Sequence, residues 1–487
     1  MKTIFNVISD FSSQAVYAIY GILATILIFS YFTDVNKDNY VYITVGFLIL
    51  SILGTYILRK GSFYLETFNE KKCLIALLLL CFAVKLTWVY FYRIEPQVDY
   101  ATFYNTAVSL SDNFVYRNRY ISLFPHIFGY ASFLSIFIKV FGSNYMIPPI
   151  VNVVLTTISM GFIYYICKKI SGVKTAIIAS ILWIIFPSQT IYNMFALSEP
   201  LYCTILLMIW TLMIIINKKL SNITFFKLFS YSVLLALLLT FMNMARPIAA
   251  VPIIALAIWL FIIDTGHVGN KKNFMNKAVY LVTVIVSYYL FSFAANQYIS
   301  VRLGEEIALT PGYNIYVGFN MNSLGTWNEE DSKLLFYYSN QEGMTADEAQ
   351  KRMLEEAKLR LQSGEINFPI LFYHKFLIFL NDDSAAASYA GSVLNHPLRF
   401  KILSNIFYYF LMFASLLGVM FASKQRNKTS LFFICLYTIG LIMAQMLVEV
   451  ASRYHYSFTI PMLILAAFGI SRIFNNGKTV GINNTLE

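Results

Sequence analysis

The sequence predicts an all-α protein, a polytopic transmembrane helical bundle of about 12 spans with outer juxtamembrane helices and a small extracytoplasmic α-helical loop region. Three observations predict this fold class. The 487 residues are 58% hydrophobic and only 13% charged, whereas soluble domains are about 45–50% apolar and about 25% charged. The apolar residues gather in runs that approach the roughly 20 residues of a spanning helix. Basic residues gather between these runs, as they do in cytoplasmic loops.

The apolar runs define the predicted spans in chain order. The runs are residues 21–31, 41–58, 74–92, 151–166, 176–186, 205–216, 233–244, 253–263, 279–293, 406–422, 431–448 and 458–470. Two further stretches, 120–141 and 366–380, are apolar but each contains a proline, a histidine and a lysine. We expect these two to be helices that lie in the outer interface without crossing.

Four regions follow from this division of the chain. They are an extra N-terminal transmembrane hairpin (1–60), a transmembrane core with a first outer loop at 93–144 (61–298), an extracytoplasmic loop with an interfacial helix (299–401) and C-terminal spans (402–487). No small-residue cleavage site follows the first run, so we expect a retained span and not a signal peptide. In the long loop, Thr345 and Glu348 form a capping-box pattern that opens a helix ending near Gln362, with Gly364 as its stop.

The basic loops predict the orientation in the cell membrane. With the N-terminus inside, and with 120–141 not crossing, the basic residues fall in inside loops and both termini are cytoplasmic. These residues are Arg59, Lys60, Lys71, Lys72, Lys168, Lys169, Lys174, Lys218, Lys219, Lys227, Lys271, Lys272, Lys277, Lys424, Arg426, Lys428, Arg472 and Lys478. The same rule explains the net charge of +11, so a role in nucleic-acid binding is not needed to account for it.

The cysteines predict neither disulfides nor a zinc site. All five lie in or at the ends of apolar runs, and they show no CxxC pair or metal-ligand spacing. They are Cys73, Cys81, Cys167, Cys203 and Cys435.

Ionisable residues at the ends of the spans gather on the predicted outer side. Such residues are costly near lipid and therefore suggest function. They are Asp99, Glu199, Arg246, Lys375, Glu449, Arg453 and His455. This set suits group transfer from a phosphate-linked lipid, because a carboxylate can take the proton of an attacking hydroxyl while cations hold the departing phosphate. The sequence therefore predicts an active site at the outer boundary of the membrane.

Each of these residues also has a plainer interpretation. Asp99 could cap the helix that begins near Tyr100. Glu199 could open the next helix with a favourable dipole contact. Arg246 and Arg453 could anchor the chain at lipid headgroups.

Four stretches carry a resemblance to a known family. They are residues 99–107, which begin Asp99-Tyr100-Ala101-Thr102-Phe103-Tyr104; residues 197–200, Leu197-Ser198-Glu199-Pro200; residues 314–320 with 325–331; and Arg453-Tyr454-His455-Tyr456 followed by Pro461. At these residues the sequence resembles the C-type (GT-C) superfamily of membrane glycosyltransferases, in a bacterial branch similar to protein mannosyltransferases and the aminoarabinose transferase of lipid A. The resemblance covers residues 74–470, and so includes the transmembrane core.

The resemblance implies an inverting glycosyltransferase of the EC 2.4 class. It would move a sugar from a polyprenyl-phosphate carrier, undecaprenyl phosphate in a bacterium, to a cell-surface polymer, glycolipid or protein on the extracytoplasmic face. Asp99 would be the catalytic base. The resemblance also implies carrier-phosphate contacts and sugar contacts, which would be Arg453, Arg246, His455 and Lys375 for the phosphate and Glu199, Tyr104 and Asn320 for the donor or sugar. Some relatives involve a divalent cation, Mg²⁺ or Mn²⁺, but the sequence shows no ligand cluster that demands one.

Two other functions use a similar membrane protein. A polysaccharide polymerase or ligase would take a pyrophosphate-linked glycan in place of a monophosphate-linked sugar. A non-enzymatic transporter or lipid flippase would show repeated halves and polar residues at mid-membrane. The sequence has no obvious internal repeat, and its polar groups gather at one face.

Overall fold

The structure of this chain is helical throughout the residues it describes. The computed structural model describes residues 2–34, 39–428 and 430–473, and these ranges contain helices and no strand. Within these ranges, nine helices are long and apolar enough to cross a membrane. A bent pair, α9 (Val173–Ile185) with α10–η2 (Pro187–Met194), turns by 59° and would make a tenth. The chain is therefore a multi-pass helical membrane protein, as the sequence predicts.

The nine long helices account for most of the apolar runs. They are α1 (Lys2–Thr33), α2–η1–α3 (Tyr40–Glu66), α4 (Glu70–Phe91), α8 (Ile147–Ser171), α11 (Glu199–Lys219), α12 (Phe225–Ala245), α14 (Lys271–Leu303), α20 (Pro397–Lys424) and η5–α22 (Ser452–Arg472). The runs 253–263 and 431–448 fall on two shorter helices, α13–η3 (Ala250–Ile263) and α21 (Ser430–Met446). The 17 residues of α21 rise only about 26 Å, less than the ~30 Å of a hydrocarbon core. The count of 12 spans therefore stays a prediction.

Two short apolar helices stand where interfacial helices are expected. The first stretch is split into α6 (Arg119–Leu123) and α7 (His126–Phe141), because Pro125 interrupts the helix before His126. The second is α18 (Phe368–Leu380), with 13 residues. Both are too short to span a bilayer as straight helices. Their position in the interface stays a prediction.

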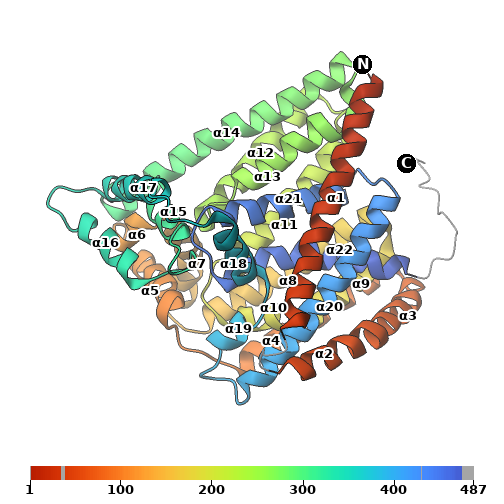
Figure 1. Ribbon diagram of the computed structural model, residues 1–487, viewed down its shortest axis with the longest axis horizontal. Helices are drawn as coiled ribbons and strands as arrows, with labels where there is room; N and C mark the ends of the chain where they lie inside the picture. The colour runs from red at the N-terminus through yellow and green to blue at the C-terminus, as the bar shows by residue number, and fades with distance from the viewer. Residues whose placement is uncertain (1, 35–38, 429, 474–487) are drawn as a thin grey trace.

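Close backbone contacts hold the centre of the bundle together. Where α20 crosses α22, a Cβ added at Gly418 would lie 2.1 Å from the Leu465 carbonyl oxygen, and one at Gly469 would lie 2.5 Å from the Ala414 oxygen. Small residues at such crossings let membrane helices approach closely. The N-terminal helix α1 runs across α20 in Figure 1, and the rings of Tyr31 and Tyr409 are 4.2 Å apart in this contact.

The outer loop helices gather at one end of the molecule. In Figure 1 this end contains α5 (Val98–Asp112), α15 (Gly312–Gly318), α16 (Glu329–Ser339) and α17 (Ala346–Gln362). The capping box of Thr345 and Glu348 is present, and α17 ends at Gln362 as predicted. The short helices η4 (Thr265–His267) and α19 (Ala385–Tyr389) complete the described elements.

Candidate active site

An acidic and a basic residue from distant parts of the chain meet at this end of the molecule. Asp99 lies in the first turn of α5, and Arg453 lies in η5, the 3-10 turn that leads into α22. An Nη of Arg453 is 2.5 Å from an Oδ of Asp99. The Asp99 side chain is 43% exposed and the Arg453 side chain 16%. The carboxylate thus faces solvent while the guanidinium is mostly enclosed by protein.

The backbone before Asp99 takes an unusual conformation. Helix α5 begins at Val98 with Gln97 as its N-cap, so the interpretation of Asp99 as the cap is wrong. Val98 has a φ of 45°, which is strained for a β-branched residue. Strained backbone of this kind often occurs at functional sites, where it directs a neighbouring side chain.

A second pair of opposite charges lies beside the first. Glu199 is the first residue of α11, and Arg246 directly follows α12. Their nearest nitrogen and oxygen are 3.9 Å apart, beyond hydrogen-bond distance. The Glu199 side chain is 2% exposed, and its Oε2 has no hydrogen-bond partner among the described residues. This carboxylate therefore retains acceptor capacity for a further donor.

Helix α7 fixes where Arg246 stands. A Cβ added at Gly129 of α7 would lie 2.0 Å from the Met244 carbonyl oxygen, so the two backbones are in direct contact. The contact falls on the last turn of α12, just before Arg246. Only glycine permits this approach.

Tyr454 joins the two ion pairs into one cluster. The Arg246 guanidinium carbon lies 4.2 Å from the centre of the Tyr454 ring, and that of Arg453 lies 5.4 Å from it. Cations within about 6 Å of an aromatic face are attracted by its quadrupole. The Tyr454 hydroxyl also donates a hydrogen bond of 3.3 Å to Glu449. Two arginines and Glu449 thus contact Tyr454, and the arginines join Asp99 and Glu199 to the same cluster.

The protein environment changes the titration of residues that border this cluster. Burial, with help from Arg246 and Arg453, lowers the pKa of His126 to about 3, so this histidine is uncharged near neutral pH. Burial raises the pKa of Glu449 above its usual value, although Arg453 opposes the shift. Burial also raises the pKa of Tyr120, to which Asp99 and Glu449 contribute.

Two predicted phosphate contacts have other partners in this geometry. The Lys375 Nζ donates to the carbonyl oxygens of Gly318, Met446 and Val448, each at 2.7 Å. These bonds use all three of its protons. His455 faces Asp383 and the Phe379 carbonyl. Both side chains are therefore occupied in holding together segments that pack near Arg453. The structure gives no support for a contact of Lys375 or His455 with a carrier phosphate.

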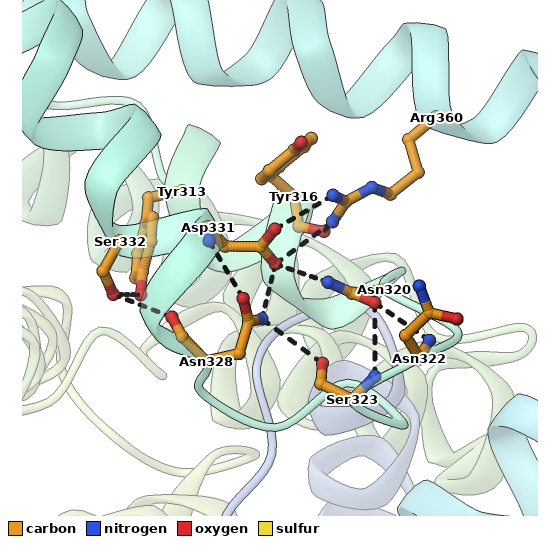
Figure 2. Close-up of polar contacts among 9 residues, drawn as sticks. All are labelled: Tyr313, Tyr316, Asn320, Asn322, Ser323, Asn328, Asp331, Ser332 and Arg360. Carbon is orange, nitrogen blue, oxygen red and sulfur yellow. Dashed lines mark hydrogen bonds and ion pairs between the residues drawn. The ribbon is translucent and has the colours of Figure 1, made fainter.

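Two predicted sugar contacts also lie in the framework. The Tyr104 ring packs against that of Tyr145, with centroids 5.3 Å apart. The Asn320 amide donates to Asp331 at 2.9 Å, and its oxygen accepts from two backbone N–H groups of the same turn. Figure 2 shows Asp331 at the centre of this network, paired with Arg360. Among the described residues, neither side chain forms a hydrogen bond or ion pair with Asp99 or Arg453, and their roles stay predictions.

The outer loop supports the chain segment that carries the cluster. The N–H of Glu449 donates to the Asn314 carbonyl at 2.8 Å, and that of Val450 donates to the Gly325 carbonyl at 2.9 Å. A Cβ added at Gly318 would lie 2.6 Å from the Val448 carbonyl carbon. The third motif of the resemblance, residues 314–331, thus builds the support for residues 446–453.

The donor set does not fit a divalent cation. Asp99 and Glu199 each face an arginine, and a cation placed there would be repelled by both guanidinium groups. In the part of the chain that the structure describes, no three His, Cys, Asp or Glu residues gather closely enough to hold a metal. We therefore derive no step through a metal ion.

Two cavities lie away from this cluster. One, of about 390 Å³, is lined by residues that include Asn217, Trp259 and Lys428. The other, of about 640 Å³, lies between Asp10 on α1 and Arg426. Both are near the first turns of α1, at the opposite end of the molecule from α17 (Figure 1).

For three residues at or near the site, the sequence predicts no individual role. Tyr454 lies inside the fourth motif and could have been chosen for its position between Arg453 and His455. Glu449 stands out as an acid after an apolar run, yet it received no role. Asp383 had no signal, because it follows another aspartate in a polar turn and its partner is far away in sequence.

Known proteins resemble this chain in structure and not in sequence. No protein-family model matches the sequence, and no curated protein sequence matches it. Among solved structures, the oligosaccharyltransferase AglB from Archaeoglobus fulgidus, in complex with an inhibitory peptide and a dolichol-phosphate, is similar with a TM-score of 0.46 and 10% identity over 83% of this chain and 50% of its own. ArnT from Cupriavidus metallidurans bound to undecaprenyl phosphate is similar with a TM-score of 0.32 and 9% identity, over 82% of this chain and 77% of its own.

Both neighbours are membrane transferases by name, and at 9–10% identity with TM-scores below 0.5 the likeness concerns the fold alone. The chain spans about half the length of the oligosaccharyltransferase. The activity and partners of that larger protein therefore do not pass to this chain through likeness of fold.

Proposed function

We propose that the protein is an inverting glycosyltransferase that takes a sugar from a polyprenyl-phosphate carrier, such as undecaprenyl phosphate, and transfers it to a cell-envelope acceptor. The acceptor would be a polymer, a glycolipid or a protein on the extracytoplasmic face. The observation that carries the proposal is the 2.5 Å contact between Asp99 and Arg453, with Arg246 against the same Tyr454 ring. A carboxylate and two guanidinium groups, the chemical groups that such a transfer needs, thus lie together.

The proposed reaction breaks the bond between the sugar C1 and the phosphate oxygen. An acceptor hydroxyl attacks C1 from the opposite side, and the new C1–O bond forms with inversion. The proton of the hydroxyl passes to the Asp99 carboxylate and then to solvent. The polyprenyl phosphate leaves with the bonding electrons and gains a second negative charge.

The two arginines suit the leaving group. The phosphate carries one negative charge in the donor and two after the bond breaks, so cations placed beside it stabilise the transition state more than the ground state. Arg453 and Arg246 approach the site from different helices and share the Tyr454 ring. The free acceptor oxygen of Glu199 could receive a hydrogen bond from a sugar hydroxyl.

The proposal is tested with purified protein in lipid nanodiscs. Radiolabelled sugars linked to polyprenyl monophosphate and to polyprenyl pyrophosphate are supplied with an envelope extract, and transfer to the extract is measured. We expect transfer from the monophosphate donor, and a loss of about 100-fold or more in Asp99→Asn. Full activity in this variant would show that Asp99 is not the base.

A matched control uses the other end of the same helix. Asp112 ends α5, is exposed and accepts a hydrogen bond from Ser111. Asp112→Asn should transfer as the wild type does. Transfer from the pyrophosphate donor alone would favour a polymerase or ligase instead, and no transfer from either donor would favour a non-enzymatic role.

A further inference from the structure

His455 has a hydrogen-bond acceptor at each ring nitrogen. Its Nδ1 is 3.0 Å from the Phe379 carbonyl oxygen, and its Nε2 is 2.9 Å from an oxygen of Asp383. Both side chains are buried, with 1% and 2% of their surface exposed. Water therefore does not substitute for either partner.

These contacts fix the number of protons that the pair holds. A carbonyl oxygen only accepts, so Nδ1 carries a proton and donates it. One further proton must then lie between Nε2 and the Asp383 carboxylate. It belongs to an imidazolium facing a carboxylate, or to a carboxylic acid facing a neutral imidazole. In both cases the pair is neutral overall, and without that proton a buried negative charge would face a nitrogen lone pair.

The surroundings favour a neutral pair. The Ser188 hydroxyl donates to the second Asp383 oxygen at 2.6 Å, and the Asp383 N–H donates to Asn405 at 3.0 Å. Burial raises the pKa of Asp383, which the His455 hydrogen bond opposes.

Other polar groups face the pair from each packed element. The centroid of the Tyr408 ring of α20 lies 5.6 Å from that of the His455 ring. Asp382 and Tyr192 also interact electrostatically with Asp383. No lysine or arginine forms an ion pair with Asp383 among the described residues. The shared proton is thus the charge that balances this carboxylate.

The pair is joined to the Asp99–Arg453 cluster through one short turn. His455 and Arg453 are two residues apart in the single turn η5. Asp383 holds that turn against α10 through Ser188 and follows α18 closely in the chain. A shift of His455 is therefore passed to Arg453 along a 3-10 turn in which only Tyr454 separates the two residues.

We propose that Asp383 is a positioning residue that holds Arg453 in place through His455, and that the arrangement depends on the proton the two share. The effect on transfer rests on the proposed function, but the effect on the η5 turn does not. Removing the proton at alkaline pH leaves an uncompensated buried carboxylate. The segment 446–458 should then loosen as the pH rises, and it should be tight when the proton is present.

Three variants separate the proton from the hydrogen bond. Asp383→Asn keeps the bond without the proton, because its amide donates to a neutral Nε2 while its oxygen accepts from Ser188. Asp383→Ala removes the bond. Asp382→Asn is the control, since Asp382 hydrogen-bonds to Ser384 and Asn405, and His455 pairs with Asp383 instead.

Hydrogen exchange of peptides from 446–458 provides the measurement. Rates are compared over mildly acidic to alkaline pH after correction for intrinsic exchange. In the wild type we expect protection to fall about tenfold as the proton is lost. In Asp382→Asn we expect the same fall at a lower pH, because the Asp382 charge raises the pKa of Asp383. In Asp383→Asn the segment 446–458 should be protected across the whole pH range. In Asp383→Ala it should be protected at none of these pH values. Carrier binding, followed with undecaprenyl phosphate in nanodiscs, should show the same pH profiles.

The outcomes distinguish this inference from the proposed function. If Asp383→Asn retains the alkaline loss of protection, or if the wild type shows none, the inference is wrong even when transfer is active. If exchange behaves as expected and the wild type transfers no sugar, the shared proton stands and the glycosyltransferase proposal fails.

Discussion

At the scale of single residues, Asp99 and a carrier phosphate are anions that would bind the same guanidinium. Asp99 contacts Arg453 at 2.5 Å, so a phosphate must compete with it or displace it. This displacement would free the carboxylate to act as a base at the moment when the donor arrives. If the proposed function holds, binding and proton abstraction are coupled through one arginine.

The competition predicts opposite effects of one substitution. Asp99→Asn removes the competing charge, so polyprenyl phosphate should bind severalfold more tightly while transfer is lost. The affinity is measured by quenching of a fluorescent carrier analogue in nanodiscs. Arg453→Gln should weaken binding instead. Weaker binding in Asp99→Asn would mean that the carboxylate contacts the donor directly and does not compete with it.

The residues at the site differ in how far the sequence reveals them. Asp99 and Arg453 could be predicted, because ionisable residues at the ends of apolar runs are rare and costly. Lys375 was recognised from the sequence, but its partners were not. Its three carbonyl partners come from two distant segments, and backbone partners leave no trace in side-chain patterns. Asp383 was not recognised, since only the folded chain brings it to His455.

At the scale of elements, the approach of α15 to the loop before η5 depends on one glycine. A Cβ at Gly318 would stand 2.6 Å from the Val448 carbonyl carbon, and that neighbour is backbone. Gly318→Ala should therefore push the 446–450 loop away and displace Arg453. We expect transfer to fall about 100-fold, since a shift of about 1 Å at a site has effects of this size.

A second glycine provides the control for this substitution. Gly61 lies in α3 and has open space around its Cβ position. Gly61→Ala should leave transfer and thermal unfolding unchanged or slightly raise stability. If Gly318→Ala transfers as well as Gly61→Ala, the loop does not set the position of Arg453.

The outer helices depend on a buried ion pair. Asp331 is 5% exposed and accepts hydrogen bonds from Arg360, Asn320 and Asn328. Burial would raise its pKa, but these bonds outweigh burial and the pKa is lowered. Asp331→Asn removes the carboxylate that balances the charge of Arg360. We expect this change to destabilise α15–α17 by about 3 kcal/mol. Hydrogen exchange in α17 is the measurement.

The same pair predicts a pH dependence. A pKa lower in the folded than in the unfolded state gives stability that is present above the unfolded pKa and lost as pH falls through the folded pKa. The difference between wild type and Asp331→Asn should therefore shrink in acid. Glu330→Gln, at an exposed neighbour, should show no such difference. If the difference in stability between wild type and Asp331→Asn persists in strong acid, it comes from packing and not from the charge of Asp331.

Element prediction succeeded where the signal is local. Hydropathy found the long helices, and the pattern of Thr345 with Glu348 found the start of α17. Hydropathy did not determine which helices are long enough to span the membrane. Helix α21 ends at Met446 because the chain there turns to meet Lys375 and the outer loop, and this is a tertiary effect. The break at Pro125 also divided one expected helix into two.

At the scale of the whole molecule, the N-terminal hairpin is joined to the bundle by specific contacts. The Tyr17 hydroxyl donates to the Asn427 carbonyl at 2.7 Å, and Tyr20 bonds to Ser415 of α20. Asp10 pairs with Lys428 at 2.7 Å. These contacts connect α1 with α20 and with the loop before α21, so α1 braces this part of the bundle.

The orientation of the molecule follows from α14, which joins the basic loop at Lys271 to the outer helices. This helix has 33 residues and rises about 50 Å, enough to cross a bilayer completely. Its two ends should therefore lie on opposite sides of the membrane. The positive-inside rule places the Lys271 end in the cytoplasm, and the candidate site would then face outward.

Cysteine labelling in intact cells tests this orientation. All five native cysteines are buried, so background labelling should be low. Lys272 and Gln341 are exposed at the two ends. Gln341→Cys should react with a membrane-impermeant maleimide in intact cells, and Lys272→Cys only after permeabilisation. The reverse pattern would place Asp99 and Arg453 in the cytoplasm and remove the basis for an extracytoplasmic transferase, while labelling of both from outside would mean that α14 does not cross.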